Sequence, residues 1–130
     1  MYYAVKFNEH TRDLLFALAE SIWPIPDNWR VYCDHITIVH SSNEKWHELS
    51  RRFVEAQGKY TTFKVIGYGI SYEAFALMVD FPSTNEVSHI TIACAPGAKP
   101  VQSNEITDWI KFDSLDAPSA CFFGWIKLCN

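Results

Sequence analysis

The spacing of apolar positions along the first quarter of the chain predicts a strand followed by a helix. Residues 2–7 alternate and are rich in Tyr, Val and Phe, which is typical of a strand. From about Thr11, apolar side chains recur at helical spacing, at Leu14, Leu15, Leu18, Ala19 and Ile22. Pro24 and Pro26 then end the helix and open a loop that runs to Asn28.

A second strand and helix are predicted in the next segment. Residues 29–40 are expected to form one strand. Ser41 and Glu44 have the spacing of a capping box, which marks a helix N-terminus. The apolar positions of this helix are Trp46, Leu49, Phe53 and Ala56. Gly58 is expected to end it, as glycine commonly does at helix C-termini.

The rest of the chain is predicted to be mostly strand. Aromatic and β-branched stretches predict strands over residues 60–70 and 74–81, paired as a hairpin, and another over about 87–95. A turn over residues 95–100 leads to Ser103, the expected N-cap of a short helix that contains Ile106, Trp109 and Ile110. A loop over residues 113–119 and a strand over Cys121–Leu128 are expected to follow. This succession predicts the α+β class.

Length and composition indicate one globular domain over residues 1–130. Hydrophobic residues make up 48% and charged residues 20% of the chain, as in an ordinary folded protein. The formal net charge is −4, which argues against a nucleic-acid duplex as partner because such binding requires many Lys and Arg side chains. A small anionic ligand, or the end of an RNA strand, requires only a local pocket.

The cysteines and the apolar runs suggest a cytoplasmic location. The four cysteines show no CxxC pair, and no signal peptide is recognised at the N-terminus, so free thiols in a reducing compartment are expected. No apolar run is long enough to span a bilayer, and no membrane partner is expected. The chain opens and closes on strand-like segments, and we expect it to be complete in itself and monomeric.

One tetrapeptide, His-Ile-Thr-Ile, occurs twice, at 35–38 and at 89–92. Both copies lie in predicted strands that are each followed by a predicted helix, which suggests an internal duplication. Successive side chains of a strand point to opposite faces, so each histidine shares a face with the threonine two residues later. The isoleucines take the other face and are expected to lie in the core. Each strand therefore presents one imidazole and one hydroxyl group together.

These two pairs carry the chemistry needed to hydrolyse a phosphodiester. One group must deprotonate water and another must protonate the leaving alkoxide, and imidazole suits both tasks near neutral pH. We expect His35 and His89 to supply this acid and base, with a slight preference for His89 as the base. Thr37 and Thr91 are expected to hold the phosphate oxygens as charge develops there. No metal or other cofactor is required.

The motifs His35-Ile36-Thr37-Ile38-Val39 and His89-Ile90-Thr91-Ile92-Ala93 resemble those of the two-histidine (2H) phosphoesterase superfamily. The nearest branch is similar to the cyclic phosphodiesterase domains of tRNA ligases involved in RNA processing, and to their small bacterial and phage relatives. The resemblance extends over nearly the whole chain, and three flanking segments support it. They are residues 26–29, residues 97–104 and residues 123–127.

The resemblance implies a bilobal, pseudo-two-fold fold in which two antiparallel sheets line a central cleft and helices lie outside. It also implies metal-independent hydrolysis of the 2′,3′-cyclic phosphate of a nucleotide or RNA end to a 2′-phosphate. Two alternatives remain at this point. The same site can degrade cyclic or 2′-5′-linked oligonucleotide signals, or a binding module can retain the pocket without turnover. The histidines are 54 positions apart, which is short for the superfamily and leaves the substrate open.

Lys99 and Ser103 are further candidates for substrate binding. Lys99 is close in sequence to the second motif and is either a phosphate ligand or a solvated loop lysine. Ser103 is a helix cap first, although a helix N-terminus also offers amides to an anion. Tyr68, Phe81 or Phe122 can stack on a nucleobase, since stacking commonly holds unpaired bases; the sequence does not distinguish among them.

The other histidines and Cys33 are expected to have no part in the chemistry. His40 falls on the face opposite His35 if the strand is regular, and His10 and His47 are expected at the surface. A metal site made of His35, His40 and His89 would need a further ligand and a broken strand. Cys33 is expected to be buried apolar filler rather than a nucleophile.

Overall fold

Strands are the commonest regular element in the computed structural model, which describes residues 1–113 and 121–130. In chain order the elements are β1 (Tyr2–Lys6), α1 (Glu9–Ile22), β2 (Arg30–Val31), β3 (His35–His40), α2 (Trp46–Val54), β4 (Tyr60–Ile70), β5 (Ala74–Asp80), β6 (His89–Cys94), the 3₁₀ helix η1 (Pro100–Glu105), β7 (Trp109–Lys111) and β8 (Phe122–Cys129). The predicted α+β class is confirmed. The expected 113–119 loop lies, apart from Asp113, outside the described residues.

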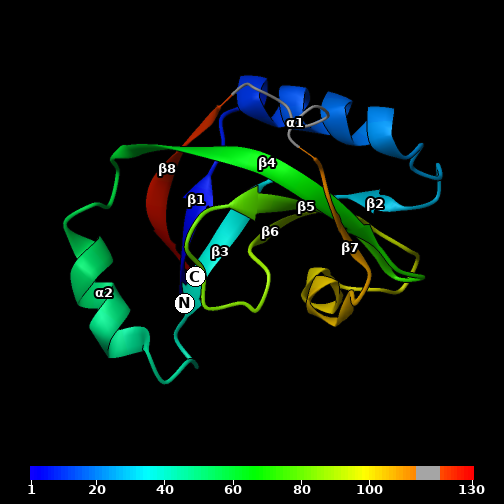
Figure 1. Cartoon of the computed structure of the whole chain (residues 1–130). Helices are drawn as coiled ribbons and strands as arrows, with labels where there is room; N and C mark the ends of the chain where they lie inside the picture. Colours follow the sequence, from blue (N-terminus) through cyan, green and yellow to red (C-terminus); the bar gives the residue numbers. More distant parts are fainter. Residues whose placement is uncertain (114–120) are drawn as a thin grey trace.

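Antiparallel pairing joins these strands into one sheet, in the order β2-β6-β3-β1-β8-β4-β5, with β7 added to β4. A further pairing between β5 and β6 brings the sheet back on itself. The strands therefore form a closed circuit, which Figure 1 shows as a curved wall with the two helices outside it. The chain ends lie side by side because Tyr2 pairs with Cys129 across β1 and β8.

The resemblance implies two separate sheets, whereas the strands form one sheet. The length of β4 is the reason. This strand has 11 residues and is long enough to pair with two sets of partners. Its first part, Tyr60–Phe63, pairs with β8, whereas its later part pairs with β5 and β7. One group of strands (β1, β3, β8) and another (β2, β5, β6, β7) are thus joined through β4 on one side. On the other side, Ile36 of β3 stands opposite Ile90 of β6.

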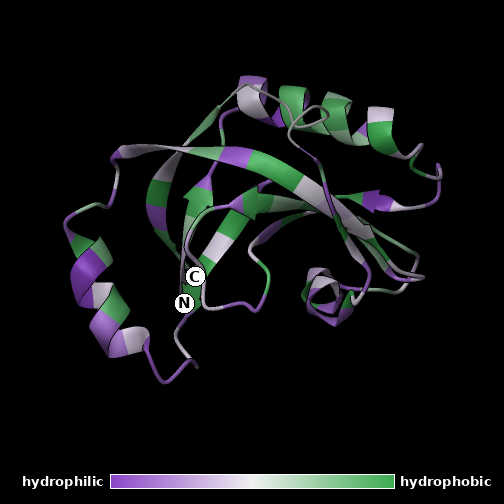
Figure 2. Cartoon of the chain, in the orientation of Figure 1, coloured by the Kyte–Doolittle hydropathy of each residue, from purple (hydrophilic) through white to green (hydrophobic). Residues whose placement is uncertain are grey.

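The core of the protein is apolar and includes residues of both the sheet and α1. Its largest fully buried side chains include Phe75, Leu15, Ile36, Ile38, Leu77, Ile90 and Ile92. The four isoleucines of the two motifs are all at most 1% exposed, as their parity predicts. In Figure 2 the hydrophobic colour is concentrated on the central strands, while α2 alternates between polar and apolar turns.

Helix α1 begins and ends close to its predicted bounds. The Asn8 side chain accepts a hydrogen bond from the Thr11 backbone N–H at 2.8 Å, which satisfies one of the free donors of the first turn. Leu15 and Ala19 on its inner face are fully buried. The N–H of Trp23 donates to the Ala19 carbonyl, and Pro24 follows at once, so the helix ends there.

The strand predicted over residues 29–40 is broken at Cys33, which corrects the sequence-based interpretation. Cys33 has a φ of 47°, a left-handed conformation that is uncommon for residues other than glycine. β2 therefore ends at Val31 and β3 begins at His35. The Cys33 side chain is fully buried in the core, and burial raises the pKa of its thiol to about 12. Its predicted role as apolar filler agrees with this environment.

Two predicted helix starts are also wrong. Helix α2 begins at Trp46, and a turn around Asn43, whose side chain accepts from the Lys45 N–H, replaces the expected Ser41 cap. Ser103 lies inside η1 instead of capping a helix, because Pro100 already begins a helical turn there. Trp109 does not continue this helix but begins β7, where it pairs with Gly69 of β4.

All four cysteines are free, as expected, and Cys33 and Cys94 are buried. Within residues 1–113 and 121–130, no helix is long and apolar enough to cross a membrane.

Candidate active site

The two motif strands share an irregularity that the sequence does not reveal. Along the β1–β3 pairing, Tyr3 stands opposite Val39 while its neighbour Ala4 stands opposite Thr37. Ile38 is therefore an extra residue, a β-bulge, between two regular stretches of the ladder. Bulges redirect the side chains that follow them, because they shift the alternation by one residue.

The second motif strand carries the same bulge at the corresponding position. Along the β5–β6 pairing, Phe75 stands opposite Ala93 while Ala76 stands opposite Thr91, so Ile92 is the extra residue. Ile38 and Ile92 occupy the same position in the two copies of the motif. The repeat thus extends beyond four identical residues to a shared backbone geometry.

The contact between the motif strands relates the two copies to each other. Ile36 and Ile90, which are equivalent residues, stand directly opposite in the antiparallel β3–β6 pairing. When equivalent residues of two antiparallel strands face each other, a local two-fold axis passes between them. Each His–Thr pair therefore lies near its counterpart from the other strand.

One cavity of about 540 Å³ contains both pairs: His35, Thr37, His89 and Thr91 all line it. This volume is within the usual range for small-ligand pockets. The four residues predicted to carry the chemistry are brought together from two strands that are distant in sequence. Tyr2, His40, Asn85 and Asn104 are among the other residues that line the cavity.

His40 corrects the expectation that it lies on the wrong face. The bulge makes Ile38 and Val39 successive buried residues, so the next side chain returns to the face of His35 and Thr37. His40 accordingly lines the cavity. Its Nδ1 is 3.0 Å from the Ser42 hydroxyl oxygen and accepts from the Ser42 backbone N–H at 3.3 Å.

His35 is held at both ring nitrogens. Nδ1 lies 2.6 Å from Oδ1 of Asp34, and Nε2 lies 3.1 Å from Oγ1 of Thr37. The hydrogen bond from His35 is the largest cause that lowers the pKa of Asp34 to about 2, and the charges of His35 and Lys6 act in the same direction. Asp34 is therefore a carboxylate at neutral pH, and it accepts a hydrogen bond from Nδ1–H of His35. Nε2 remains directed at Thr37.

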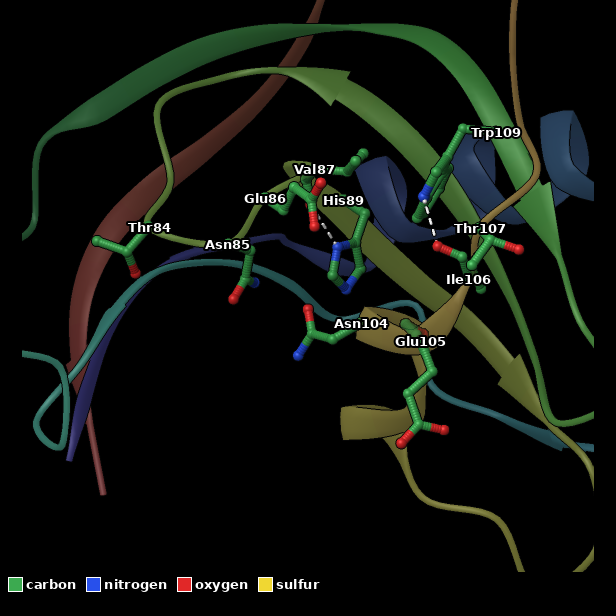
Figure 3. A pocket seen from close by; sticks show the side chains of 11 residues that line it. Thr84, Asn85, Glu86, Val87, His89, Asn104, Glu105, Ile106, Thr107 and Trp109 are labelled. Atoms are coloured by element: carbon green, nitrogen blue, oxygen red, sulfur yellow. Dashed lines mark hydrogen bonds between the residues drawn. The ribbon is translucent and has the colours of Figure 1, made fainter.

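His89 has a different environment. It is 8% exposed, and its Nδ1 donates to the Val87 carbonyl oxygen at 2.8 Å, as the dashed line in Figure 3 shows. In the neutral ring Nε2 then carries a lone pair. Burial lowers the pKa of His89, and the charge of His35 lowers it further, although the Val87 hydrogen bond opposes both. The His89 imidazole is therefore uncharged at neutral pH, and a positive charge on His35 disfavours its protonation.

Thr91 belongs to a small hydroxyl network with Ser103. The two hydroxyl oxygens are 2.8 Å apart, and Thr91 also donates to the Pro100 carbonyl oxygen at a long 3.4 Å. Ser103 is fully buried, so its contact with Thr91 replaces solvent. If Ser103 donates to Thr91, the Thr91 proton can turn from Pro100 to an anion in the cavity. Ser103 therefore supports Thr91 from behind rather than lining this cavity.

Lys99 and the three aromatic candidates lie away from this cavity. Lys99 is exposed, and its backbone N–H donates to the Gln102 side-chain oxygen at 2.6 Å. Phe122 packs on Phe63 in the core, with ring centroids 5.8 Å apart. Tyr68 and Phe81 are partly buried against the core cluster. None of these side chains is among the described residues that line the cavity.

Tyr2 is the aromatic residue that does line the cavity, and the sequence did not single it out. Its ring centroid is 5.3 Å from that of His35 and 6.3 Å from that of His40, and it is nearly parallel to His40. Burial is the largest cause that raises the pKa of Tyr2 to about 12, so the phenol keeps its proton. The alternation of β1 places Tyr2 on one face, but only the pairing with β3 shows which residues it contacts.

Neither a metal site nor a related protein assigns a role to this cavity. In the part of the chain that the structure describes, no three His, Cys, Asp or Glu side chains are grouped so that they could hold a metal ion. The chain matches no protein-family model and no curated protein. The residues of the cavity themselves combine a neutral buried imidazole, a second imidazole bound to a carboxylate, and two hydroxyl groups. Such a set can transfer two protons around one bound anion.

Proposed function

We propose that this protein is a phosphodiesterase of the 2H type, which hydrolyses the 2′,3′-cyclic phosphate of a nucleotide or RNA end to a 2′-phosphate. The observation that supports it is a single cavity lined by two imidazoles in different environments and by two threonine hydroxyls. Unequal environments favour unequal roles, because hydrolysis of a diester requires one base and one acid. Two imidazoles in identical environments would give no basis for assigning the base and the acid.

In the proposed mechanism His89 is the base and His35 the acid. Nε2 of His89 takes a proton from water as the water oxygen forms a bond to phosphorus. The bond from phosphorus to O3′ breaks, and O3′ takes the proton from Nε2 of His35. Asp34 accepts a hydrogen bond from Nδ1–H of His35 at 2.6 Å. This hydrogen bond orients the ring and stabilises its positive charge. Exchange of protons with solvent then restores both rings.

The threonines are proposed to bind the two non-bridging oxygens. Charge increases on these oxygens in the transition state, so hydroxyl donors placed there lower the barrier. We further propose that the two groups of strands joined through β4 correspond to the two lobes of the 2H fold. The supporting observations are the bulges at Ile38 and Ile92 and the pairing of Ile36 with Ile90.

The direct test is incubation of the purified protein with the four nucleoside 2′,3′-cyclic monophosphates in excess EDTA. We expect conversion to nucleoside 2′-monophosphates, resolved from the 3′ isomers by chromatography. Turnover that requires an added divalent cation would contradict the mechanism. Ligand that binds but is recovered unchanged after long incubation would instead favour a binding module.

The pH dependence of the reaction follows from the environment of His89. A base must be neutral, and burial lowers the pKa of His89 below its ordinary value of 6.5. We therefore expect the acid limb of kcat/KM, over which the base becomes protonated, to be centred below pH 6.5. Initial rates between pH 4.5 and 8 measure this midpoint. An acid limb centred above pH 6.5 would assign the base to another group.

Ser103→Ala is expected to lower kcat roughly 2- to 10-fold, the effect of losing one hydrogen bond of ordinary strength. The Thr91 hydroxyl would lose its 2.8 Å partner and no longer be oriented towards the substrate. Steady-state kinetics and thermal unfolding measure the two consequences separately. Ser21→Ala is the matched control, because the exposed Ser21 hydroxyl bonds only to Leu18 of its own helix among the described contacts. Equal kcat in both variants would contradict the role of Ser103.

A further inference from the structure

A second cavity lies directly beside the first and shares a wall with it. Its volume is about 530 Å³, and it has Asn85, His89 and Asn104 in common with the cavity that holds the two motifs. In Figure 3 the two asparagine side chains lie on one side of the His89 ring and Trp109 lies on the other. A ligand held against His89 in the first cavity can therefore extend into the second.

Trp109 forms a fixed aromatic wall of this second cavity. Its indole N–H donates to the Ile106 carbonyl oxygen at 3.0 Å, and its ring centroid is 5.8 Å from that of His89. Gly69 of β4 lies against the ring, since a Cβ at this position would be 2.7 Å from Cε3 of Trp109. The absence of a side chain at Gly69 thus allows the indole to pack against β4. A ring held in this way is pre-organised for stacking, because little side-chain freedom remains to be lost.

The polar groups of the second cavity select against phosphate. Glu86 and Glu105 line it, and among its described lining residues there is no Lys or Arg. Carboxylates repel an anion but accept hydrogen bonds from N–H groups. Asn85 and Asn104 add amides that both donate and accept. An uncharged planar group with N–H donors fits this combination of a flat aromatic wall, acceptors and amides.

We infer that the second cavity binds the nucleobase of the substrate and that guanine is the preferred base. This inference rests on the proposed function, because the phosphate must occupy the first cavity for the base to reach the second. The Watson–Crick edge of guanine carries adjacent N1–H and N2–H₂ donors, which one carboxylate can accept together. Adenine and cytosine offer one amino group at this edge, and uracil offers one N–H. Trp109 supplies the stacking surface, which favours purines by its area.

The test compares kcat/KM for guanosine, adenosine, cytidine and uridine 2′,3′-cyclic monophosphates. Wild-type protein is expected to favour guanosine at least 10-fold over uridine, on the order of one good base-edge contact. Trp109→Ala is expected to lower kcat/KM roughly 5- to 100-fold, the range for loss of base stacking, mainly through KM. Trp109→Phe should restore most of it, since a ring remains. Because Trp109 contacts His89, a fall in kcat alone would indicate a structural effect and contradict the inference.

The carboxylates are tested without disturbing His89. Glu86→Gln and Glu105→Gln are each expected to lower guanosine activity more than uridine activity and so to reduce the ratio of the two, because guanine offers two adjacent donors and uracil one. Glu55→Gln, an exposed glutamate at the end of α2, is the charge-matched control and should leave the ratio as it is. Equal activity on all four bases, unaffected by these variants, would overturn the base site while the phosphodiesterase itself stands.

An equilibrium measurement separates the two proposals. Guanosine 2′-monophosphate and uridine 2′-monophosphate are titrated into wild-type protein and Trp109→Ala, with binding followed by calorimetry. Tighter binding of the guanosine compound, lost in Trp109→Ala, would support the base site even if wild-type protein turned over none of the cyclic substrates, a result that would overturn only the proposed function. Equal binding of both compounds would overturn the base site.

Discussion

Replacing His89 by asparagine is expected to lower kcat for cyclic-phosphate hydrolysis by about 10²–10⁴-fold, the usual contribution of a general base. The Asn side chain can still donate to the Val87 carbonyl, as Nδ1 of His89 does at 2.8 Å, but it offers no basic nitrogen to water. The fold should therefore be retained while the base is lost. Single-turnover kinetics in EDTA measure the rate, and thermal unfolding measures the fold.

His35→Asn is expected to reduce kcat by a similar factor, because the acid that protonates O3′ would be absent. The control is His10→Asn, since His10 is an exposed residue near the start of α1 and lies outside both cavities. Full activity of either single variant in EDTA would exclude paired-histidine catalysis. Loss of activity in His10→Asn as well would indicate a general effect of removing histidine.

Ile90→Ala is expected to destabilise the protein by about 2–5 kcal/mol, the range for removing a buried isoleucine side chain to Cβ. Ile90 is fully buried and stands opposite Ile36 where β3 meets β6, so the cavity left behind would lie at the junction of the two motif strands. Urea unfolding monitored by tryptophan fluorescence measures the free energy of unfolding. The packing lost at this junction would also disturb the His–Thr pairs that flank it.

Ile110→Ala is the matched control for this stability effect. Ile110 is also an isoleucine on a strand, but it is 51% exposed, so its truncation should change the free energy of unfolding by about 0.5 kcal/mol or less. Equal costs for Ile90→Ala and Ile110→Ala would mean that the β3–β6 junction does not contribute to the core as the structure indicates.

Most elements were predictable because local patterns determine them. The alternation of residues 2–7 and 60–70, and the helical spacing from Leu14 to Ile22, correspond to β1, β4 and α1. The errors occur where one tertiary contact outweighs a local preference. Trp109 has helical spacing from Ile106, yet it joins a strand because Gly69 leaves room for it against β4.

The candidate site was likewise predictable only where spacing along one strand determines it. Parity along a strand was enough to pair His35 with Thr37 and His89 with Thr91, because neither bulge falls between the members of a pair. The same parity failed for His40, which lies beyond the bulge at Ile38. No sequence signal marks Asn85 or Tyr2, since residues of these types are frequent outside active sites. Asn104 was marked only as part of the 97–104 segment that supports the resemblance. Asp34 had a weak signal as the acidic neighbour of His35.

By itself the sequence determined the α+β class, the burial of the motif isoleucines and the two His–Thr pairs, because each depends only on spacing along one strand or helix. Only the tertiary structure decided that the pairs share one cavity, that His40 joins them, and that His35 and His89 have different partners. These properties depend on the β3–β6 contact, the bulges and the burial of one ring. They arise from contacts between distant segments, and no local pattern encodes such contacts.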